Sequence, residues 1–200
     1  MTYQAFIVPG VIAQSVLIIA IFSGLAIIWE RDLGISQRMV VAPVARSALI
    51  TGRAVSTGLR AVAQVAIVLA GIAISGIPLR WSVLGIVGAL VVSLIGAMLF
   101  SSISMVIASA MRSREQFMGL GQLITLPLFF ASNALYPIAL MPKWLQAVAR
   151  LNPLTYLVEL LRWLLLDIGP QNLPRAVAIV VVGTIIAITA ASRLYPRRVM

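Results

Sequence analysis

Five apolar runs, each long enough to cross a lipid bilayer, constrain this 200-residue sequence more than any other feature. A helix needs about 17 to 25 mostly apolar residues to cross a hydrocarbon core about 30 Å thick. The runs cover residues 6–29, 61–79, 82–111, 116–141 and 176–192. We therefore predict an all-α membrane protein in which residues 1–200 form a single domain, a bundle of five transmembrane helices.

The composition excludes a soluble protein. Hydrophobic residues make up 62% of the sequence and charged residues 10%, whereas a soluble domain has about 45–50% apolar and about 25% charged residues. The formal net charge of +10 would suggest a nucleic-acid partner in a soluble chain, but in a membrane protein basic residues first report topology. We expect membrane lipid as a partner and no nucleic acid.

The missing residue types exclude several kinds of chemistry. The sequence has no Cys and no His, so it offers no thiolate, no imidazole base and no His-ligated metal site. It also lacks a glycine-rich nucleotide-binding loop. All five acids lie outside the apolar runs: Glu30, Asp32, Glu115, Glu159 and Asp167. We predict that the chain is not an enzyme, has no catalytic residue, metal or cofactor, and takes any energy of ATP hydrolysis from a partner chain.

Within the segment 142–170, residues 151–166 are apolar by composition but do not fit a sixth span. Glu159 and Arg162 lie near the middle of the apolar stretch, and each charge at the centre of a membrane helix costs about 2.5–3.5 kcal/mol. The two residues are three positions apart, so they share one helical face and can pair. We predict an interfacial helix around Trp144, followed by a re-entrant or shallow helix broken at Pro153.

The distribution of basic residues predicts the orientation. Ten of the fifteen Lys and Arg residues lie in the loop 30–60, in residues 112–114 and in the C-terminal tail. The loops that carry more basic residues normally face the cytoplasm. We therefore expect the N-terminus outside, the C-terminus in the cytoplasm, and the segment 142–170 on the outer side.

The third apolar run contains a row of small residues spaced four apart: Gly85, Ala89, Ser93, Ala97 and Ser101. Such a row lies on one face of a helix and lets another helix approach closely. We predict tight helix packing along this row, and a wall that lines a substrate path is the alternative.

Two motifs resemble those of one transporter family. The first lies in the loop 30–60 and consists of a Glu-Arg start, a short amphipathic helix, a proline and a Gly-Arg finish: Glu30, Arg31, Gly34, Arg38, Pro43, Arg46, Gly52 and Arg53. The second lies about 90 residues further along: Asn133, Pro137, Pro142, Trp144, Asn152, Pro153, Tyr156, Glu159 and Arg162. Together they resemble the first cytoplasmic loop and the C-terminal signature of ABC-2 type transporter permeases, most closely those of the drug-resistance, daunorubicin-type exporter branch.

The resemblance implies partners and roles for these residues. In that family a coupling helix, here residues 33–41, is seated in a cleft of a separate ATPase subunit. Contacts to the ATPase would come from Glu30, Arg31, Gly34, Arg38, Pro43 and Arg46, and the second motif would form an outer gate. The family implies a homodimer or heterodimer of permease subunits in the plasma membrane (cell inner membrane), with ATP and Mg²⁺ bound to the ATPase.

The sequence departs from the family pattern in two places. Asn133 stands where the family commonly has Gly, which would alter the bend into the outer segment. The family has six spans and a cytoplasmic N-terminus, whereas Met1 falls at the beginning of what matches the second span. We therefore expect the first span to be missing from this sequence, through a late start codon or a shortened subunit.

These features predict the membrane permease of an ATP-driven exporter. Few polar side chains lie in the spans, among them Gln14, Gln64, Gln122 and Asn133, which suits an amphipathic or lipophilic cargo, such as a drug, an antibiotic or a lipid-like molecule. One alternative is a membrane scaffold without transport activity that docks a soluble partner through its Arg-rich loop. Another is an ATP-independent carrier that depends on Glu159, the one ionisable group placed to carry a proton.

Overall fold

The computed structural model describes residues 3–33, 46–111, 113–170 and 172–199, without the side chains of residue 46 and of residues 195–199. Within these ranges the chain forms seven α-helices, one short 3₁₀ helix and no strand. In chain order the elements are α1 (Tyr3–Asp32), α3 (Arg46–Ile74), α4 (Val83–Ala110), α5 (Arg114–Phe130), η1 (Ile138–Leu140), α6 (Lys143–Leu151), α7 (Pro153–Leu166) and α8 (Leu173–Val199). The predicted all-α fold is confirmed.

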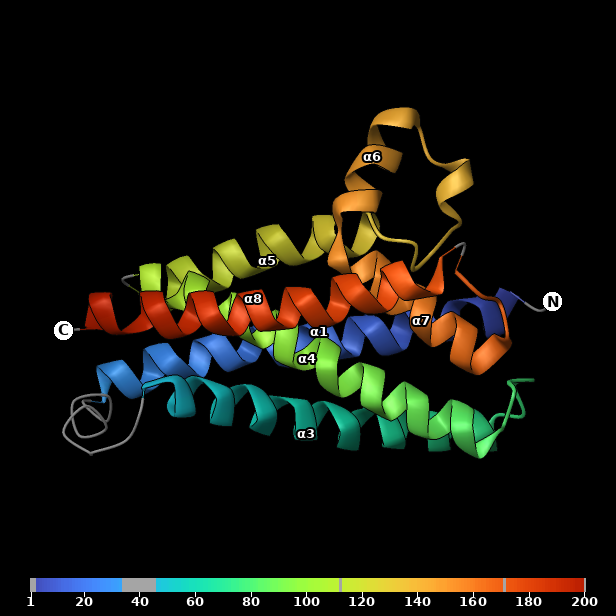
Figure 1. Ribbon diagram of the computed structural model, residues 1–200, viewed down its shortest axis with the longest axis horizontal. Coiled ribbons are helices and arrows are strands. Elements are labelled where there is room, and N and C mark those ends of the chain that lie inside the picture. Colours follow the sequence, from blue (N-terminus) through green and yellow to red (C-terminus); the bar gives the residue numbers. More distant parts are fainter. Residues whose placement is uncertain (1–2, 34–45, 112, 171, 200) are drawn as a thin grey trace.

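In the described part of the chain, four long helices form the body of a multi-pass membrane bundle. The segments in this part that are long and apolar enough to cross a membrane are Tyr3–Asp32, Ser47–Ile74, Val83–Ala110 and Leu173–Leu194. They run along the longest axis of the molecule, and the N- and C-termini lie at opposite ends of it (Figure 1). The helices α6 and η1 project from the side of the bundle, near the end that holds the N-terminus (Figure 1).

The predicted fourth span, residues 116–141, is wrong as a continuous helix. The helix α5 has 17 residues and ends at Phe130, after Pro127 has removed one backbone donor from its last turn. Ser132 then donates both its backbone N–H and its Oγ to the carbonyl of Phe129, at 3.1 and 2.6 Å. These bonds satisfy the helix end and turn the chain. Even so, α5 packs along α1 and leads the chain back towards the end that holds α6 and α7 (Figure 1).

The predicted second span, residues 61–79, is displaced, because α3 begins at Arg46 and ends at Ile74. Consequently the predicted loop 30–60 is much shorter, since residues 46–60 are helical. The extra turns hold together because a buried stripe continues through them at helical spacing: Ile50, Ala54, Thr57, Ala61 and Val65. Arginines on the other faces of α3 interrupt the apolar sequence before residue 61. They do not interrupt the buried stripe, because they lie outside it.

The central helix is α4, which packs against α1, α3, α7 and α8. Its row of small residues is buried, and Ala89, Ser93, Ala97 and Ser101 have no exposed surface. A Cβ atom at Gly85 would lie 2.6 Å from the carbonyl oxygen of Leu164 in α7. The row therefore serves close packing of helices, and its alternative role as a wall of a substrate path is not supported.

The helices α6 and α7 correspond to the predicted helix around Trp144 and the helix that follows it, and the chain breaks between them at Asn152. The side chain of Asn152 accepts a hydrogen bond from the backbone N–H of Leu154 at 2.9 Å, and Pro153 is the first residue of α7. An Asn cap followed by Pro is a favourable helix start. At the other end of α7, Asp167 adopts a left-handed conformation with φ of 59° and forms an ion pair with Arg80 at 2.6 Å. This pair ties α7 to the connection between α3 and α4.

Candidate functional sites at the two ends of the bundle

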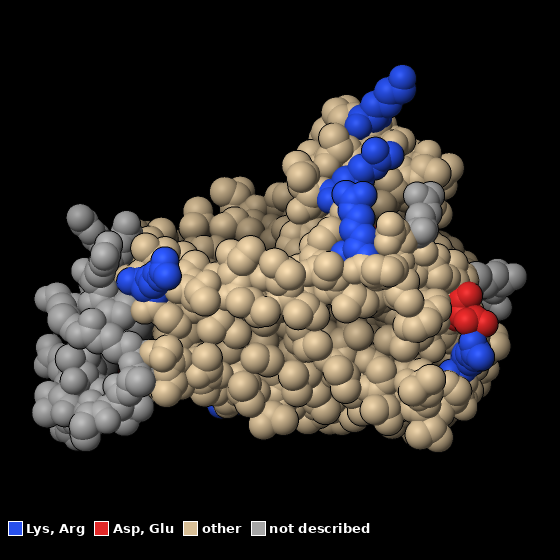
Figure 2. Space-filling model, in the orientation of Figure 1, with Lys and Arg blue, Asp and Glu red and all other residues tan. Residues whose placement is uncertain are grey.

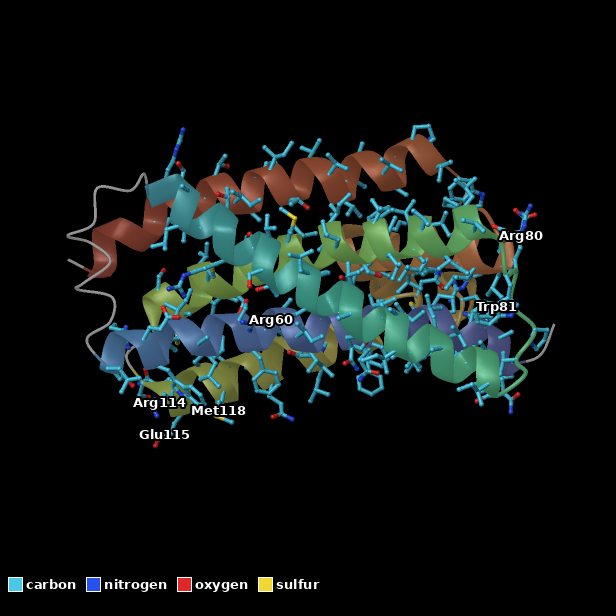
Figure 3. All side chains as sticks on the ribbon, turned by 90° about the horizontal axis from the view of Figure 1, so that it is seen from below. Arg60, Arg80, Trp81, Arg114, Glu115 and Met118 are labelled. Carbon is cyan, nitrogen blue, oxygen red and sulfur yellow. The ribbon has the colours of Figure 1, made fainter. Side chains whose placement is uncertain are left out.

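Many charged side chains lie at the two ends of the bundle, whereas Arg60 lies between the ends, in the middle of α3 (Figure 3). Arg114 and Glu115 lie at one end, and Arg80 lies at the opposite end (Figure 3). A column of basic side chains extends over α6 and the beginning of α8, and the surface between the two ends is largely uncharged on the face in view (Figure 2). Arg114 and Arg80, which are predicted to lie on opposite sides of the membrane, therefore lie at opposite ends of the molecule (Figure 3).

The first site is an ion-pair cluster formed by Glu30, Arg31, Asp32, Arg53 and Arg114. Glu30 of α1 pairs with Arg53 of α3, and these side chains are 28% and 18% exposed. Asp32 pairs with Arg114 of α5 at 2.9 Å. Between them, Arg31 donates a hydrogen bond to the carbonyl of Met111, just after α4, at 2.9 Å. Three consecutive residues thus attach the end of α1 to three other helices.

A cation–π contact between Arg114 and Trp29 further stabilises the ion-pair cluster. The guanidinium of Arg114 lies over the ring of Trp29, 5.5 Å from its centroid. Such cation–π contacts contribute about 0.5–1 kcal/mol at exposed sites. Because Arg114 contacts both Asp32 and Trp29, it fixes the start of α5 against the last turn of α1.

The predicted contacts to an ATPase fall on and beside this cluster. Glu30 and Arg31 are engaged in contacts within the chain. Arg46 is the first residue of α3, and its side chain is outside the description. Gly34, Arg38 and Pro43, together with most of the predicted coupling helix 33–41, lie outside the described residues. The coupling role of all six residues stays a prediction.

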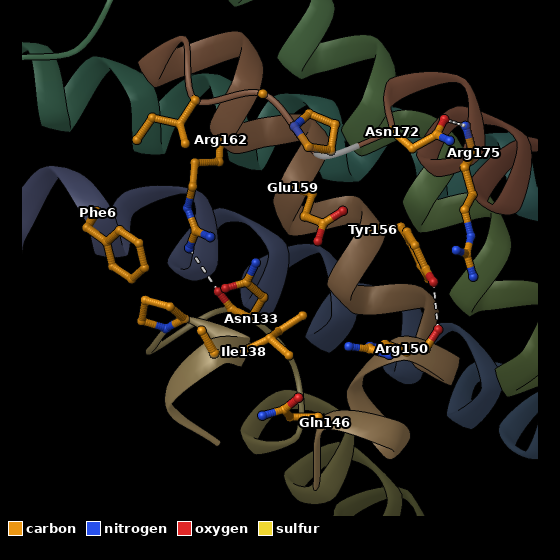
Figure 4. A pocket seen from close by; sticks show the side chains of 15 residues that line it. Phe6, Asn133, Ile138, Gln146, Arg150, Tyr156, Glu159, Arg162, Asn172 and Arg175 are labelled. Carbon is orange, nitrogen blue, oxygen red and sulfur yellow. Dashed lines mark hydrogen bonds between the residues drawn. The ribbon is translucent and has the colours of Figure 1, made fainter. Parts of the chain in front are cut away.

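The second site, which we call the arginine pocket, is a hollow of about 770 Å³ at the opposite end (Figure 4). It is enclosed by α1, α6, α7, the beginning of α8, η1 and the turns beside them. Its lining residues are Phe6, Asn133, Pro137, Ile138, Ala139, Gln146, Arg150, Tyr156, Glu159, Arg162, Ile168, Gly169, Pro170, Asn172 and Arg175.

Arg162 lies on the inner wall of the arginine pocket and is 5% exposed. Its Nη2 donates a hydrogen bond to the carbonyl of Asn133 at 2.8 Å. Its guanidinium lies over the ring of Phe6, 4.1 Å from the centroid. These two contacts hold it towards α1 and the turn after α5 (Figure 4).

The predicted pairing of Glu159 with Arg162 is not among the ion pairs of the described residues. Glu159 lies between Arg162 on one side and Tyr156 and Arg175 on the other (Figure 4). The reason is tertiary, because the carbonyl of Asn133 and the ring of Phe6 draw Arg162 away from its neighbour on α7.

Two hydrogen bonds fix the opposite wall of the arginine pocket. The hydroxyl of Tyr156 donates to the carbonyl of Arg150 at 2.6 Å, which joins α7 to the last turn of α6. The side chain of Asn172 accepts from the backbone N–H of Arg175 at 3.2 Å, so that Asn172 caps the first turn of α8. Arg150 and Arg175 are thereby presented from two different helices (Figure 4).

Five of the nine residues predicted for the outer gate line this pocket: Asn133, Pro137, Tyr156, Glu159 and Arg162. The other four do not line it. Pro142 precedes α6 and Pro153 begins α7. Trp144 is 69% exposed. Asn152 caps α7 and also donates its Nδ2 to the carbonyl of Leu128 at 2.7 Å.

Sequence reasoning missed Phe6, Arg150, Asn172 and Arg175 as pocket residues. Arg150 and Arg175 were recognisable as basic residues on the side of the membrane that has fewer of them. Nothing in their spacing placed them around one hollow, because α6 and α8 meet there only through the fold.

The third candidate site is a hollow between α1 and α5. It has a volume of about 310 Å³ and brings together Gln14, Gln122 and Thr125. The remaining lining is apolar or glycine: Ile18, Ile21, Phe22, Leu25, Phe117, Met118, Gly121 and Leu126. Two of the polar side chains noted in the spans therefore face one largely apolar groove on the side of the bundle.

Comparison with known proteins gives a consistent result. The sequence model of the family described as ABC-2 type transporter matches residues 1–166. The putative transport permease ycf38 of Porphyra purpurea is 30% identical over 165 residues, which are 82% of this chain and 56% of that protein. The daunorubicin resistance ABC transporter permease protein DrrB1 of Streptomyces coeruleorubidus is 26% identical over 154 residues, 77% of this chain and 54% of that protein.

A third relative is the probable multidrug ABC transporter permease YbhR of Escherichia coli (strain K12). It is 29% identical over 164 residues, 79% of this chain and 43% of that protein. The chain thus spans about half the length of these three relatives. The family match ends at Leu166, the last residue of α7, so that both the ion-pair cluster and most of the arginine pocket lie inside it.

Proposed function

Because the chain belongs to the ABC-2 type transporter family, we propose that it is the membrane permease subunit of an ATP-driven exporter. A separate ATPase subunit binds and hydrolyses ATP, with Mg²⁺. Two permease subunits, identical or different, enclose the path of an amphipathic or lipophilic substrate through the plasma membrane. The ion-pair cluster lies in the cytoplasm together with the C-terminus, and the arginine pocket lies on the outer side.

The single observation that carries this proposal is the attachment of α1 at the ion-pair cluster. Residues 34–45 join the end of α1 to the beginning of α3. A force that the ATPase exerts on this connection acts on helices linked by Glu30, Arg31 and Asp32 to α3, α5 and the end of α4. Rigid helices that are joined in this way move as a body. The cluster can therefore convert a local push into a displacement of several spans.

The proposed substrate class rests on the groove between α1 and α5. Its lining is mostly apolar, with two glutamine side chains and one threonine. An apolar surface with a few polar groups is the usual lining of a site for a small amphipathic molecule. Among the relatives, one is named as a daunorubicin resistance permease and another as a probable multidrug permease. Both names agree with an amphipathic cargo.

The test is ATP-dependent uptake of daunorubicin, a fluorescent probe, into inside-out vesicles that contain the permease and its ATPase. We expect Glu30→Gln to lower the rate about fivefold, since it weakens the link between α1 and α3. The matched control is Glu115→Gln, an exposed acid at the same end of the bundle, which we expect to leave the rate unchanged. Replacing residues 34–45 by a Gly-Ser linker of the same length should abolish ATP-dependent uptake.

Three results would contradict the proposal. Uptake that survives replacement of residues 34–45 would remove the coupling role of this connection. Uptake driven by an ion gradient without any ATPase, and lost in Glu159→Gln, would indicate an ATP-independent carrier. If an ATPase binds the chain but no amphiphile raises its rate of ATP hydrolysis, the result would indicate the scaffold function instead.

A further inference from the structure

Two buried polar atoms on the wall of the arginine pocket have no hydrogen-bond partner. In the described part of the chain, four buried side-chain atoms lack one: Ser93 Oγ, Asn133 Oδ1, Thr155 Oγ1 and Arg162 Nε. Of these residues, Asn133 and Arg162 line the pocket. A buried polar group without a partner is costly, so such groups are rare unless a water or a ligand completes them. The pocket therefore contains an incomplete donor and an incomplete acceptor.

The charge of the lining favours a negative ligand. Arg150, Arg162 and Arg175 contribute three positive charges, and Glu159 contributes one negative charge. The first turn of α8 also faces this space, with Asn172 and Arg175 both on the wall. The N-terminal end of a helix has a partial positive charge. The pocket therefore has a net positive potential even though Glu159 is negatively charged.

The geometry of Arg162 suits an oxyanion. Its ring contact with Phe6 covers one face of the guanidinium, and Nη2 is used by the carbonyl of Asn133. The Nε–H has no partner. Guanidinium N–H groups bind phosphate and carboxylate oxygens in the plane of the group. A side chain that is 5% exposed and already held by two contacts loses little freedom on binding.

The size and the apolar part of the pocket suit an amphipathic molecule. A volume of about 770 Å³ is within the range of about 300–1,000 Å³ for ligand sites and exceeds what one phosphate group fills. Phe6, Ile138 and Ile168 supply apolar surface beside the arginines. A charged head group and the first part of an apolar chain can therefore be accommodated together.

From these observations we propose that the arginine pocket binds an oxyanion, with Arg162 and Arg175 as its main cationic contacts. The same chemistry is offered by the phosphate head group of an anionic lipid-like molecule and by free phosphate. The apolar surface and the volume favour the head group of an amphipathic molecule. Binding at this site can be measured without the ATPase and without transport.

The experiment is titration calorimetry on the full chain purified in a maltoside detergent. The probes are dihexanoylphosphatidylglycerol, dihexanoylglycerol and inorganic phosphate. We expect saturable binding of one phosphatidylglycerol per chain and none of dihexanoylglycerol, which has the same acyl chains but no phosphate. Inorganic phosphate separates the two sources of the oxyanion. Weaker binding of phosphate than of phosphatidylglycerol identifies the lipid-like head group, and equal binding identifies the free ion.

Four variants assign the binding to named residues. We expect Arg162→Lys, which keeps the charge but has no Nε–H, to weaken binding about tenfold. Arg175→Gln should weaken it about threefold, since one partly solvated charge is lost. Glu159→Gln should tighten binding about threefold, because a repulsive charge is removed. The matched control is Arg193→Gln, an exposed arginine at the other end of α8, which should have no effect.

If Arg162→Lys fails to fold, the other variants still test the proposal, because Arg175→Gln is expected to weaken binding and Glu159→Gln is expected to tighten it. Loss of a structural contact can weaken binding but does not explain tighter binding in Glu159→Gln. Equal affinity for phosphatidylglycerol and dihexanoylglycerol would overturn the proposal, and so would no binding of either. Unchanged affinity in both Arg175→Gln and Glu159→Gln would also overturn it. None of these measurements depends on ATP, so the failure of this inference and the failure of the exporter function are distinguishable.

Discussion

The two ends of the bundle use their charges in different ways. At the ion-pair cluster, Glu30 and Asp32 each pair with an arginine of another helix, and Arg31 binds a backbone carbonyl. At the arginine pocket, Glu159 forms none of the ion pairs of the described residues, and Arg162 retains a buried Nε–H without a partner. One end therefore joins helices, whereas the other end leaves polar groups available for a ligand.

This difference matches what each end has to do in a transporter of the proposed kind. Joined helices transmit a displacement because they move as a body. A buried donor without a partner beside a hollow is a feature of binding sites, where the ligand supplies the missing acceptor. The following predictions change one end while the other stays intact, in order of decreasing expected effect.

The largest effect is expected from Gly10→Ala, which changes only the end with the arginine pocket. A Cβ atom at Gly10 would lie 2.5 Å from the carbonyl oxygen of Ala134, next to Asn133. Because a backbone atom cannot rotate away, we expect α1 and the turn after α5 to separate, at a cost of about 1–3 kcal/mol. The melting temperature in detergent should fall, and phosphatidylglycerol binding should weaken.

Gly71→Ala is the control for that prediction. Gly71 is also in a long helix, but a Cβ atom there would meet nothing within 4 Å. Ala is favoured over Gly in a helix interior by about 0.5–1 kcal/mol, so this variant should be as stable as the parent or slightly more so. Equal melting temperatures of the two variants would mean that α1 and the turn are not in close contact.

A smaller effect is expected from Arg53→Glu, which changes only the ion-pair cluster. It places two acids side by side in a half-buried position, and we expect a loss of about 1–2 kcal/mol in the free energy of unfolding. The double variant Glu30→Arg with Arg53→Glu should recover a large part of this loss. Thermal unfolding measures both effects. A double variant no more stable than Arg53→Glu alone would show that the pair is not what holds α1 to α3.

The smallest effects are expected from Asp32→Asn and Asp167→Asn, one at each end. Both acids are in exposed ion pairs, in which the side chains are 39% and 63% exposed respectively. Exposed pairs contribute about 0–1 kcal/mol, and Asn tolerates the left-handed conformation of Asp167 as well as Asp does. Both variants should melt within a few degrees of the parent. A large loss for Asp167→Asn would assign the Arg80 pair a structural role that its exposure does not indicate.

The spans could be predicted from the sequence where charged or capping residues stand at both ends of the helix. The first and third runs correspond to α1 and α4 within a few residues, because each is bounded by charged or capping residues. The start of α3 could not be predicted by looking for uncharged runs, since its first turns contain arginines outside the buried stripe. The end of α5 at Phe130 depended on Pro127 and on the hydrogen bonds of Ser132, which an apolar run does not reveal.

The candidate sites could be predicted only in part. The motif that contains Glu159 and Arg162 identified one wall of the arginine pocket, and the motif that begins with Glu30 identified the ion-pair cluster. The partners were not predictable, because Arg53, Arg114 and Phe6 come from helices whose packing the motifs do not specify. The expected pairing of Glu159 with Arg162 came from local spacing and was overridden by contacts from other helices.

The sequence by itself determined that this chain is an all-helical membrane bundle of the ABC-2 family, with its charged residues outside the five apolar runs. The long apolar runs dictate this, since a charged group in the bilayer is costly and a helix satisfies its own backbone. Only the tertiary structure decided which charges find partners. Whether an arginine is paired depends on distances of a few ångström between helices remote in sequence, and these distances follow from the packing of small residues such as Gly10 and Gly85.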